Sequence, residues 1–262
     1  MTNTNAKPPA RSPWFIPGRP GVDPSLRLFC FPYAGGGAVI YRRWAESLPR
    51  SVEVLAVQPP GRGNRIREAP LLRVSAIVEA LAAEVVPYLD RPFAFFGHSL
   101  GALVAFELAC RLRRERGVEP ARLFVSGRRA PHVPGDYPVT HDLPATEFIA
   151  ELRRLNGTPP EVLEHEELME LMIPLLRADF EVCETYKFEP GPPLACPVTA
   201  FGGIEDRDVT REYIGAWREH TNGPFLMRML PGDHFFIHSA EATLLQVVAR
   251  ELHELTTARG AN

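Results

Sequence analysis

The chain has 262 residues and a net charge of −3, with 45% hydrophobic and 23% charged residues. This balance is typical of a globular protein and excludes a strongly basic chain built to bind nucleic acid. No apolar run approaches the roughly 18 residues of a membrane span, and residues 1–25 lack the apolar core of a secretion signal. We therefore expect a cytoplasmic protein without a nucleic-acid or membrane partner. The four cysteines show no metal-ligand spacing, so we expect no metal site.

Residues 1–25 are rich in proline and are expected to form an extended segment that Trp14 and Phe15 pin to the surface of a domain spanning residues 26–262. Short apolar runs alternate with helical patterns through this domain. The expected strands are Leu26–Phe31, Val52–Gln58, Pro92–Gly97, Arg122–Gly127, Pro197–Gly202 and Phe225–Leu230. The expected helices are Val39–Leu48, Val74–Leu89, Leu100–Arg116, Val209–Glu219 and Ala240–Leu255. The alternation predicts an α/β fold with a doubly wound, mostly parallel sheet.

The alternation stops between about residues 130 and 195. This stretch contains helical segments at Ala145–Leu155 and from Pro160 to Tyr186, the second interrupted by Pro174. Ligands of open α/β sheets bind at the carboxyl ends of the strands. We therefore expect a helical lid over the active site, although a helix packed on the main sheet would show the same pattern.

Gly97-His98-Ser99-Leu100-Gly101 is a Gly-x-Ser-x-Gly motif between a predicted strand and a predicted helix. This context is typical of the nucleophile of α/β-hydrolases, in which a sharp turn lifts the serine above the sheet. The same position could hold a simple helix N-cap, but both glycines favour a nucleophile. We expect Ser99 to be the nucleophile, and the Leu100 N–H at the helix start to stabilise an oxyanion.

In such hydrolases the acid and then the base follow the serine along the chain. His234 follows the last predicted strand through a Pro-Gly turn and is the expected base, with His238 as the alternative. Asp206 follows the strand at 197–202 and is the expected acid that orients the imidazole. Glu205 and Asp208 are close competitors for that role.

A glycine-rich segment, Phe31-Pro-Tyr-Ala-Gly-Gly-Gly37, follows the first predicted strand. Glycines let backbone N–H groups approach a ligand closely, and a second oxyanion donor of these hydrolases comes from a loop at this position. We place that donor at the Ala34 N–H and expect Tyr33 to line the mouth of the site. A flexible turn without function is the alternative.

Five motifs occur in order: FPYAGG after the first strand, QPPGRGNR at 58–65, GHSLGA at 97–102, GGIEDRDV at 202–209 and PGDHFF at 231–236. Together, over residues 26–255, they resemble the type II thioesterases of polyketide synthases and non-ribosomal peptide synthetases. The resemblance implies an α/β-hydrolase that removes acyl or aminoacyl groups from the phosphopantetheine arm of carrier proteins and so clears stalled or mischarged assembly lines. It assigns Ser99, Asp206 and His234 to the triad and Ala34 and Leu100 to the oxyanion hole.

The resemblance implies transient contact with acyl or peptidyl carrier domains and no cofactor of the enzyme's own, since the partner carries the phosphopantetheine. Arg62 and Arg65 are candidates for contact with the carrier or the pantetheine phosphate, and Met169 and Met172 in the apolar lid are candidates for acyl binding. A solvated loop and ordinary lid packing are the respective alternatives. A carboxylesterase, an acyltransferase and a non-catalytic carrier-binding protein are the rival functions.

Overall fold

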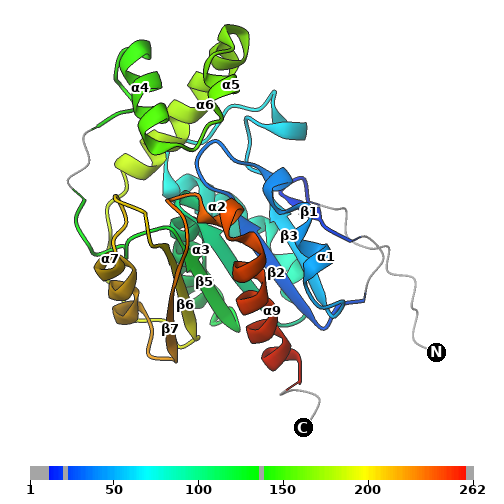
Figure 1. Cartoon of the computed structure of the whole chain (residues 1–262). Helices are drawn as coiled ribbons and strands as arrows, with labels where there is room; N and C mark the ends of the chain where they lie inside the picture. Colours follow the sequence, from blue (N-terminus) through cyan, green and yellow to red (C-terminus); the bar gives the residue numbers. More distant parts are fainter. Residues whose placement is uncertain (1–11, 20–22, 136–138, 258–262) are drawn as a thin grey trace.

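A single sheet of seven strands runs through the centre of the molecule (Figure 1). The structure is a computed structural model that describes residues 12–19, 23–135 and 139–257. The strands are Phe15–Pro17 (β1), Leu26–Phe31 (β2), Val52–Val57 (β3), Phe93–His98 (β4), Arg122–Ser126 (β5), Val198–Gly203 (β6) and Phe225–Leu230 (β7). Their order is β1-β3-β2-β4-β5-β6-β7, with β2 to β7 parallel and β1 antiparallel to β3. The predicted α/β fold class is confirmed.

Helices cover both faces of the sheet, and a further group stands beyond one end of it (Figure 1). The α-helices are Trp44–Ser47 (α1), Val74–Glu84 (α2), Leu100–Arg116 (α3), Ala145–Leu155 (α4), Pro160–Leu163 (α5), Glu166–Glu184 (α6), Arg211–Gly215 (α7), Phe236–Ser239 (α8) and Glu241–Thr257 (α9). The 3₁₀ helices are Ala38–Tyr41 (η1), Gly63–Arg65 (η2), Val86–Tyr88 (η3) and Ala216–His220 (η4). No helix in the described ranges is long and apolar enough to cross a bilayer.

Side chains alternate between the two faces along each buried strand, because successive Cβ atoms of a strand point to opposite sides. In β4, Phe93 and Phe95 join the core beneath α2 and α3. Ala94 and Phe96 join the core beneath α1 and α9. Both faces of β4 are therefore buried, which accounts for its nearly continuous apolar sequence.

The expected lid is formed by α4, α5 and α6, which lie between β5 and β6 in the chain and stand together beyond the sheet (Figure 1). They share a small hydrophobic cluster of their own, whose buried members are Phe148, Leu152, Leu163, Met169 and Leu176. Pro174 lies inside α6 and does not interrupt it. A proline removes its own N–H from the helix ladder and crowds the carbonyl four residues before it. The helix nevertheless continues, and Leu176, Ala178, Asp179 and Val182 beyond the proline are buried.

Several sequence expectations differ from the observed elements, among them the helix expected at Val74–Leu89, which is α2 followed by η3. The extended N-terminal segment contributes β1 to the sheet edge, with Trp14 and Phe15 buried as expected, so the described part of this segment belongs to the domain. The helix expected at Val39–Leu48 is η1 followed by the short α1, because buried Tyr41 and Trp44 pack on the sheet and set the path of the chain. The helix expected at Val209–Glu219 is α7 followed by η4.

Candidate active site

Ser99 lies in the sharp turn between β4 and α3 predicted from its motif. Its backbone has φ 53° and ψ −116°, a region that side-chain-bearing residues rarely adopt. A Cβ on Gly97 would lie 2.1 Å from the Gly101 carbonyl oxygen, and a Cβ on Gly101 would lie 2.1 Å from the Phe31 carbonyl oxygen. Both glycines are therefore required by close backbone packing, and the turn they permit presents the serine hydroxyl above the sheet.

The structure brings the three predicted triad residues together. His234 Nε2 lies 3.1 Å from Ser99 Oγ, and His234 Nδ1 lies 2.7 Å from Asp206 Oδ2. A carboxylate is only an acceptor, so Nδ1 carries the proton and Nε2 is left to accept the proton of the serine hydroxyl. These contacts match the arrangement needed for general-base activation of a serine.

The Asp206 carboxylate is held in place by the backbone that follows it. Its Oδ1 accepts from the N–H groups of Asp208 at 3.0 Å and Val209 at 2.9 Å, and its side chain is 2% exposed. The competing acids lie elsewhere: Asp208 pairs with Arg154, and Glu205 is exposed. The geometry therefore favours Asp206 as the partner of His234.

The other candidate histidines have different partners. Tyr33 Oη lies 2.9 Å from Nε2 of His238, the alternative base. His98 is completely buried between Ser126 Oγ, 2.9 Å from its Nδ1, and the His234 carbonyl oxygen, 3.0 Å from its Nε2. Burial, reinforced by the neighbouring His234, lowers the pKa of His98 well below 6.5 and keeps its ring neutral.

The two backbone groups expected to form the oxyanion hole border the serine. Leu100 begins α3, where helix N–H groups have no partner within the helix. Ala34 lies in the loop after β2 and lines the same pocket as Ser99 and His234. Neither N–H has an acceptor within the described part of the chain. Both groups are thus free to bind a developing negative charge.

A pocket opens over Ser99 between the hydrolase body and the lid, and we call its apolar part the acyl chamber. Its lid side is formed by Leu152 and Leu155 of α4 and by Leu176 and Phe180 of α6. Its apolar lining from the body is Tyr33, Ala34, Val209 and Phe235. The predicted position of Tyr33 at this pocket agrees with the structure. A chamber of this character suits a hydrocarbon chain extending from a carbonyl at Ser99.

The two methionines expected to bind the acyl group lie outside the acyl chamber. Met169 is buried in the lid's hydrophobic cluster, and Met172 packs against that cluster. The structure therefore does not bring these two side chains to the pocket over Ser99, and their role in acyl binding stays a prediction. The side of α6 that faces Ser99 carries Leu176 and Phe180, one and two turns beyond Met172.

The two arginines expected to contact a carrier protein are also buried, each 8% exposed. The Arg62 guanidinium forms a bidentate ion pair with Asp179 of α6. Arg65 pairs with Glu68 and stacks on Trp14, its Cζ 4.3 Å from the ring centre. Both guanidinium groups are engaged within the protein and hold the loop between β3 and α2 in place, so the structure does not support the predicted docking role. No sequence signal connects Arg62 with Asp179, because 117 positions separate them.

The lid reaches both loops that carry the expected acid and base. Arg154 of α4 contacts Asp208 at 3.1 Å, two residues after Asp206. Asn156, at the end of α4, donates to Asp233 at 2.8 Å, next to His234. These contacts place the end of α4 directly over the site.

The seven-stranded sheet, the serine turn and the Ser-His-Asp contacts define an α/β-hydrolase. Residues 26–255 match the model of the thioesterase family, described as "Thioesterase domain". The chain belongs to this family, and the resemblance found in its motifs is confirmed.

Individual proteins are similar over nearly the whole chain. Linear gramicidin dehydrogenase LgrE of Brevibacillus parabrevis is 46% identical over 255 residues, which is 96% of each chain. The RedJ thioesterase from the prodiginine biosynthetic pathway of Streptomyces coelicolor is 44% identical, with a TM-score of 0.83 over 87% of this chain and 91% of that one. BorB, a type II thioesterase from the borrelidin biosynthetic cluster, is 38% identical, with a TM-score of 0.84 over 91% of this chain and 97% of that one.

Proposed function

We propose that this protein hydrolyses acyl or aminoacyl thioesters on the phosphopantetheine arm of carrier proteins and so frees stalled or mischarged polyketide or peptide assembly lines. The observation that supports this most strongly is the contact of Ser99 with His234 and of His234 with Asp206 beneath an apolar chamber. Membership of the thioesterase family and similarity to RedJ and BorB supply the substrate class.

The first half of the reaction forms an acyl-enzyme. Ser99 Oγ attacks the thioester carbonyl carbon while His234 Nε2 takes the hydroxyl proton. The negative charge that develops on the carbonyl oxygen is stabilised by the N–H groups of Ala34 and Leu100. The carbon–sulfur bond then breaks, and the thiol leaves with the proton from His234.

The second half of the reaction restores the enzyme. Water attacks the acyl carbon after giving a proton to His234 Nε2, and a second tetrahedral anion forms against the same two N–H groups. The bond to Ser99 Oγ breaks as His234 returns the proton to the serine. The products are the free acid and the unloaded carrier thiol.

The chemistry is tested by measuring thiol release from an acyl-pantetheine with single variants. We expect Ser99→Ala and His234→Gln to lower kcat/KM by at least about 10³-fold, with Asp206→Asn also strongly impaired. Glu205→Gln is the matched control, because this exposed carboxylate neighbours Asp206 without touching His234. Wild-type turnover by Ser99→Ala with an unchanged unfolding temperature would refute the proposed mechanism, and no thiol release by the wild type itself would favour a non-catalytic carrier-binding role.

The carrier-directed part needs a separate comparison. Hydrolysis of a panel of acyl-loaded carrier proteins is measured against the matched free acyl-pantetheines. We expect higher kcat/KM on the loaded carriers. Equal rates would leave a thioesterase without carrier recognition, higher rates on simple esters would favour a carboxylesterase, and release only with an added alcohol or amine would favour an acyltransferase.

The name of the Brevibacillus relative denotes a dehydrogenase, which is a different reaction class. A serine activated by an imidazole and a carboxylate is suited to acyl transfer rather than to hydride transfer. Measuring the absorbance of a nicotinamide cofactor together with thiol release distinguishes a dehydrogenase from a thioesterase. We expect thiol release without added nicotinamide and no change in its absorbance when it is supplied.

A further inference from the structure

We propose that Asp179, on lid helix α6, is a positioning residue that fixes the oxyanion-hole loop, residues 33–37. The inference rests on the proposed function, because it takes the Ala34 N–H of this loop as an oxyanion donor. It assigns part of the lid to the catalytic machinery.

Asp179 reaches from the lid into the hydrolase body and is almost fully enclosed there, with its side chain 3% exposed. Its Oδ2 accepts from the Gly35 N–H at 2.6 Å and from Arg62 Nη1 at 2.7 Å. Its Oδ1 accepts from Arg62 Nη2 at 2.8 Å. The carboxylate thus binds the residue directly after the proposed donor, through charge-assisted hydrogen bonds of the strong class.

Arg62 binds the next residue of the loop as well. Its Nη1 also donates to the Gly36 carbonyl oxygen at 2.9 Å. Gln58 then joins the two segments, because its side chain accepts from the Ala38 N–H at 3.0 Å and donates to the Arg62 carbonyl oxygen at 2.9 Å. Asp179 and Arg62 therefore bind successive residues of this loop, and Gln58 binds Ala38 directly after it.

The loop needs such support because of its own sequence. Three consecutive glycines have wide backbone freedom, and Gly35 adopts a left-handed φ of 78°. The Gly36 N–H donates to the Tyr33 carbonyl oxygen at 2.9 Å, and the Gly35 N–H is bound by Asp179. With these two amides engaged, the loop is fixed where Ala34 lines the pocket beside Ser99. A donor held in place before the reaction stabilises the transition state without reorganisation.

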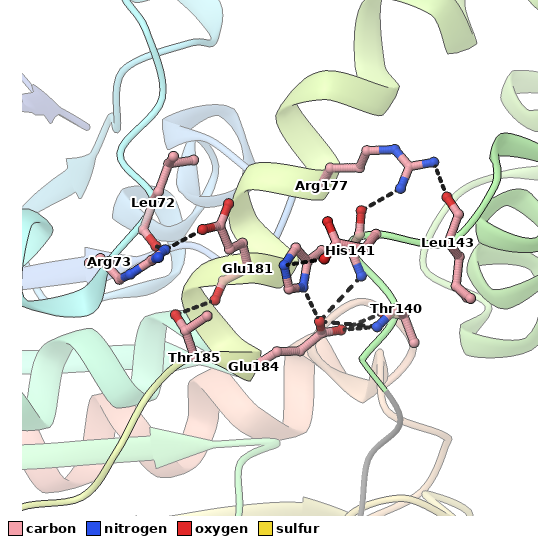
Figure 2. A network of polar contacts seen from close by, with 10 residues as sticks. Leu72, Arg73, Thr140, His141, Leu143, Arg177, Glu181, Glu184 and Thr185 are labelled. Atoms are coloured by element: carbon pink, nitrogen blue, oxygen red, sulfur yellow. Dashed lines mark hydrogen bonds and ion pairs between the residues drawn. The ribbon is translucent and has the colours of Figure 1, made fainter.

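The part of α6 that carries Asp179 is fixed to its surroundings. Figure 2 shows Glu184 accepting from Thr140 and His141, whereas the pair of Glu181 with Arg73 in the same view is more exposed and contributes little to this anchoring. Arg177 donates to the carbonyl oxygens of His141 and Leu143 in the same view. The α6 residues that make these contacts all follow Pro174 in the chain. The carboxyl-terminal half of α6 is thus a rigid support from which Asp179 can hold the loop.

The test compares Asp179→Asn with Glu181→Gln in steady-state thiol release from an acyl-pantetheine. Both variants neutralise a carboxylate of α6 that is paired with an arginine, but the pair at 181 is more exposed and does not touch the loop. We expect Asp179→Asn to lower kcat and kcat/KM together by roughly 10- to 100-fold, because one oxyanion donor is displaced. We expect Glu181→Gln to stay within about twofold of wild type.

A second measurement separates positioning from a merely structural role. Affinity for a non-hydrolysable amide analogue of the substrate should be unchanged in Asp179→Asn, whereas the rate of Ser99 phosphonylation by an alkyl fluorophosphonate should fall in parallel with kcat. Arg62→Lys keeps the charge but loses the bidentate contact, so a smaller loss of kcat is expected. This variant keeps the test valid if Asp179→Asn does not fold at the assay temperature.

The inference is overturned if a folded Asp179→Asn retains kcat within twofold of wild type, or if it loses activity only through KM. It is also overturned if Glu181→Gln loses as much as Asp179→Asn. These outcomes are distinct from failure of the proposed function, which would show as absent thiol release by the wild type or as full activity of Ser99→Ala.

Discussion

His98 precedes the nucleophile in the chain, yet in the structure it supports the base. A backbone carbonyl only accepts, so Nε2–H donates to the His234 carbonyl oxygen at 3.0 Å and Nδ1 accepts from the Ser126 hydroxyl at 2.9 Å. The lowered pKa of His98 keeps the ring in this neutral form. The residue therefore links β4 and β5 to the loop that carries the expected base.

We expect His98→Leu to lower kcat about 10-fold or more, because the half-buried His234 carbonyl and the buried Ser126 hydroxyl lose their partner and the base loop can then shift. His98→Gln should recover most of kcat, since its amide N–H₂ can reach the same carbonyl. The measurement is thiol release well below the unfolding temperature. Equal kcat in His98→Leu and wild type would show that the base loop needs no such support.

The functional residues that were predicted correctly are marked by neighbouring residues in the sequence. Those that were misplaced depend on partners far away in the chain. Ser99 lies in a five-residue motif whose glycines report close backbone packing, and Asp206 and His234 each follow a predicted strand. Arg62 looked like an exposed cation because nothing near it in sequence neutralises it. Its partner, Asp179, lies on lid helix α6, and the sequence does not predict where this helix packs.

Secondary-structure elements were likewise predictable only where the local sequence carries the signal. All six strands of the parallel part of the sheet were predictable from their apolar runs. Burial on both faces explains these runs in inner strands such as β4, whereas the edge strand β7 is apolar although only its Leu230 is buried. The edge strand β1 has three residues and ends in a proline, so it gives no strand pattern. In α6, apolar residues surround the helix, and periodicity alone did not separate Met169, which faces the lid core, from Leu176 and Phe180, which also reach the acyl chamber.

Helix α4 offers a test of the acyl chamber, because Leu155 near its end lines the pocket while neighbouring Arg153 is exposed. We expect Leu155→Trp to shorten the chamber. If three methylenes of a long acyl chain lose contact, at about 0.8 kcal/mol each, kcat/KM for that chain falls roughly 50-fold. Acetyl-pantetheine should be affected less than about twofold.

Arg153→Trp is the control, since it places the same indole on α4 outside the pocket. The measurement is kcat/KM across a series of acyl-pantetheines of increasing length. An equal loss for short and long chains in Leu155→Trp would mean that the acyl group does not run along α4.

Across the whole molecule, two hydrophobic cores flank one sheet, and the lid adds a third, smaller cluster. The triad candidates lie directly after the carboxyl ends of strands. Their positions are therefore fixed by the strands, which pack into the two hydrophobic cores. Ser99 follows β4, Asp206 follows β6 and His234 follows β7. The contacts among these three side chains thus come from the body of the domain, and the lid adds contacts to the loops of the acid and the base through Arg154 and Asn156.

Buried histidines make the stability of the whole fold depend on pH. Burial lowers the pKa of His220 from 6.5 to about 4, with nearby His132 adding to the shift. The pKa of His98 is lowered too, mainly by burial. In the unfolded chain both rings bind protons near pH 6.5, so below that pH the unfolded state holds more protons than the folded state. The contribution of these histidines to the free energy of unfolding is therefore complete above pH 6.5. It declines as the pH falls toward the pKa values of the folded state.

We expect the free energy of unfolding, measured by urea titration, to fall between pH 7.5 and 5.5. The slope from each such histidine is at most about 1.4 kcal/mol per pH unit. His220→Gln should reduce the slope, because its amide takes up no proton in either state, while carboxylate contributions remain common to variant and wild type. A slope that is the same in both proteins, or stability that rises on acidification, would mean that His220 is as readily protonated in the fold as in the unfolded chain.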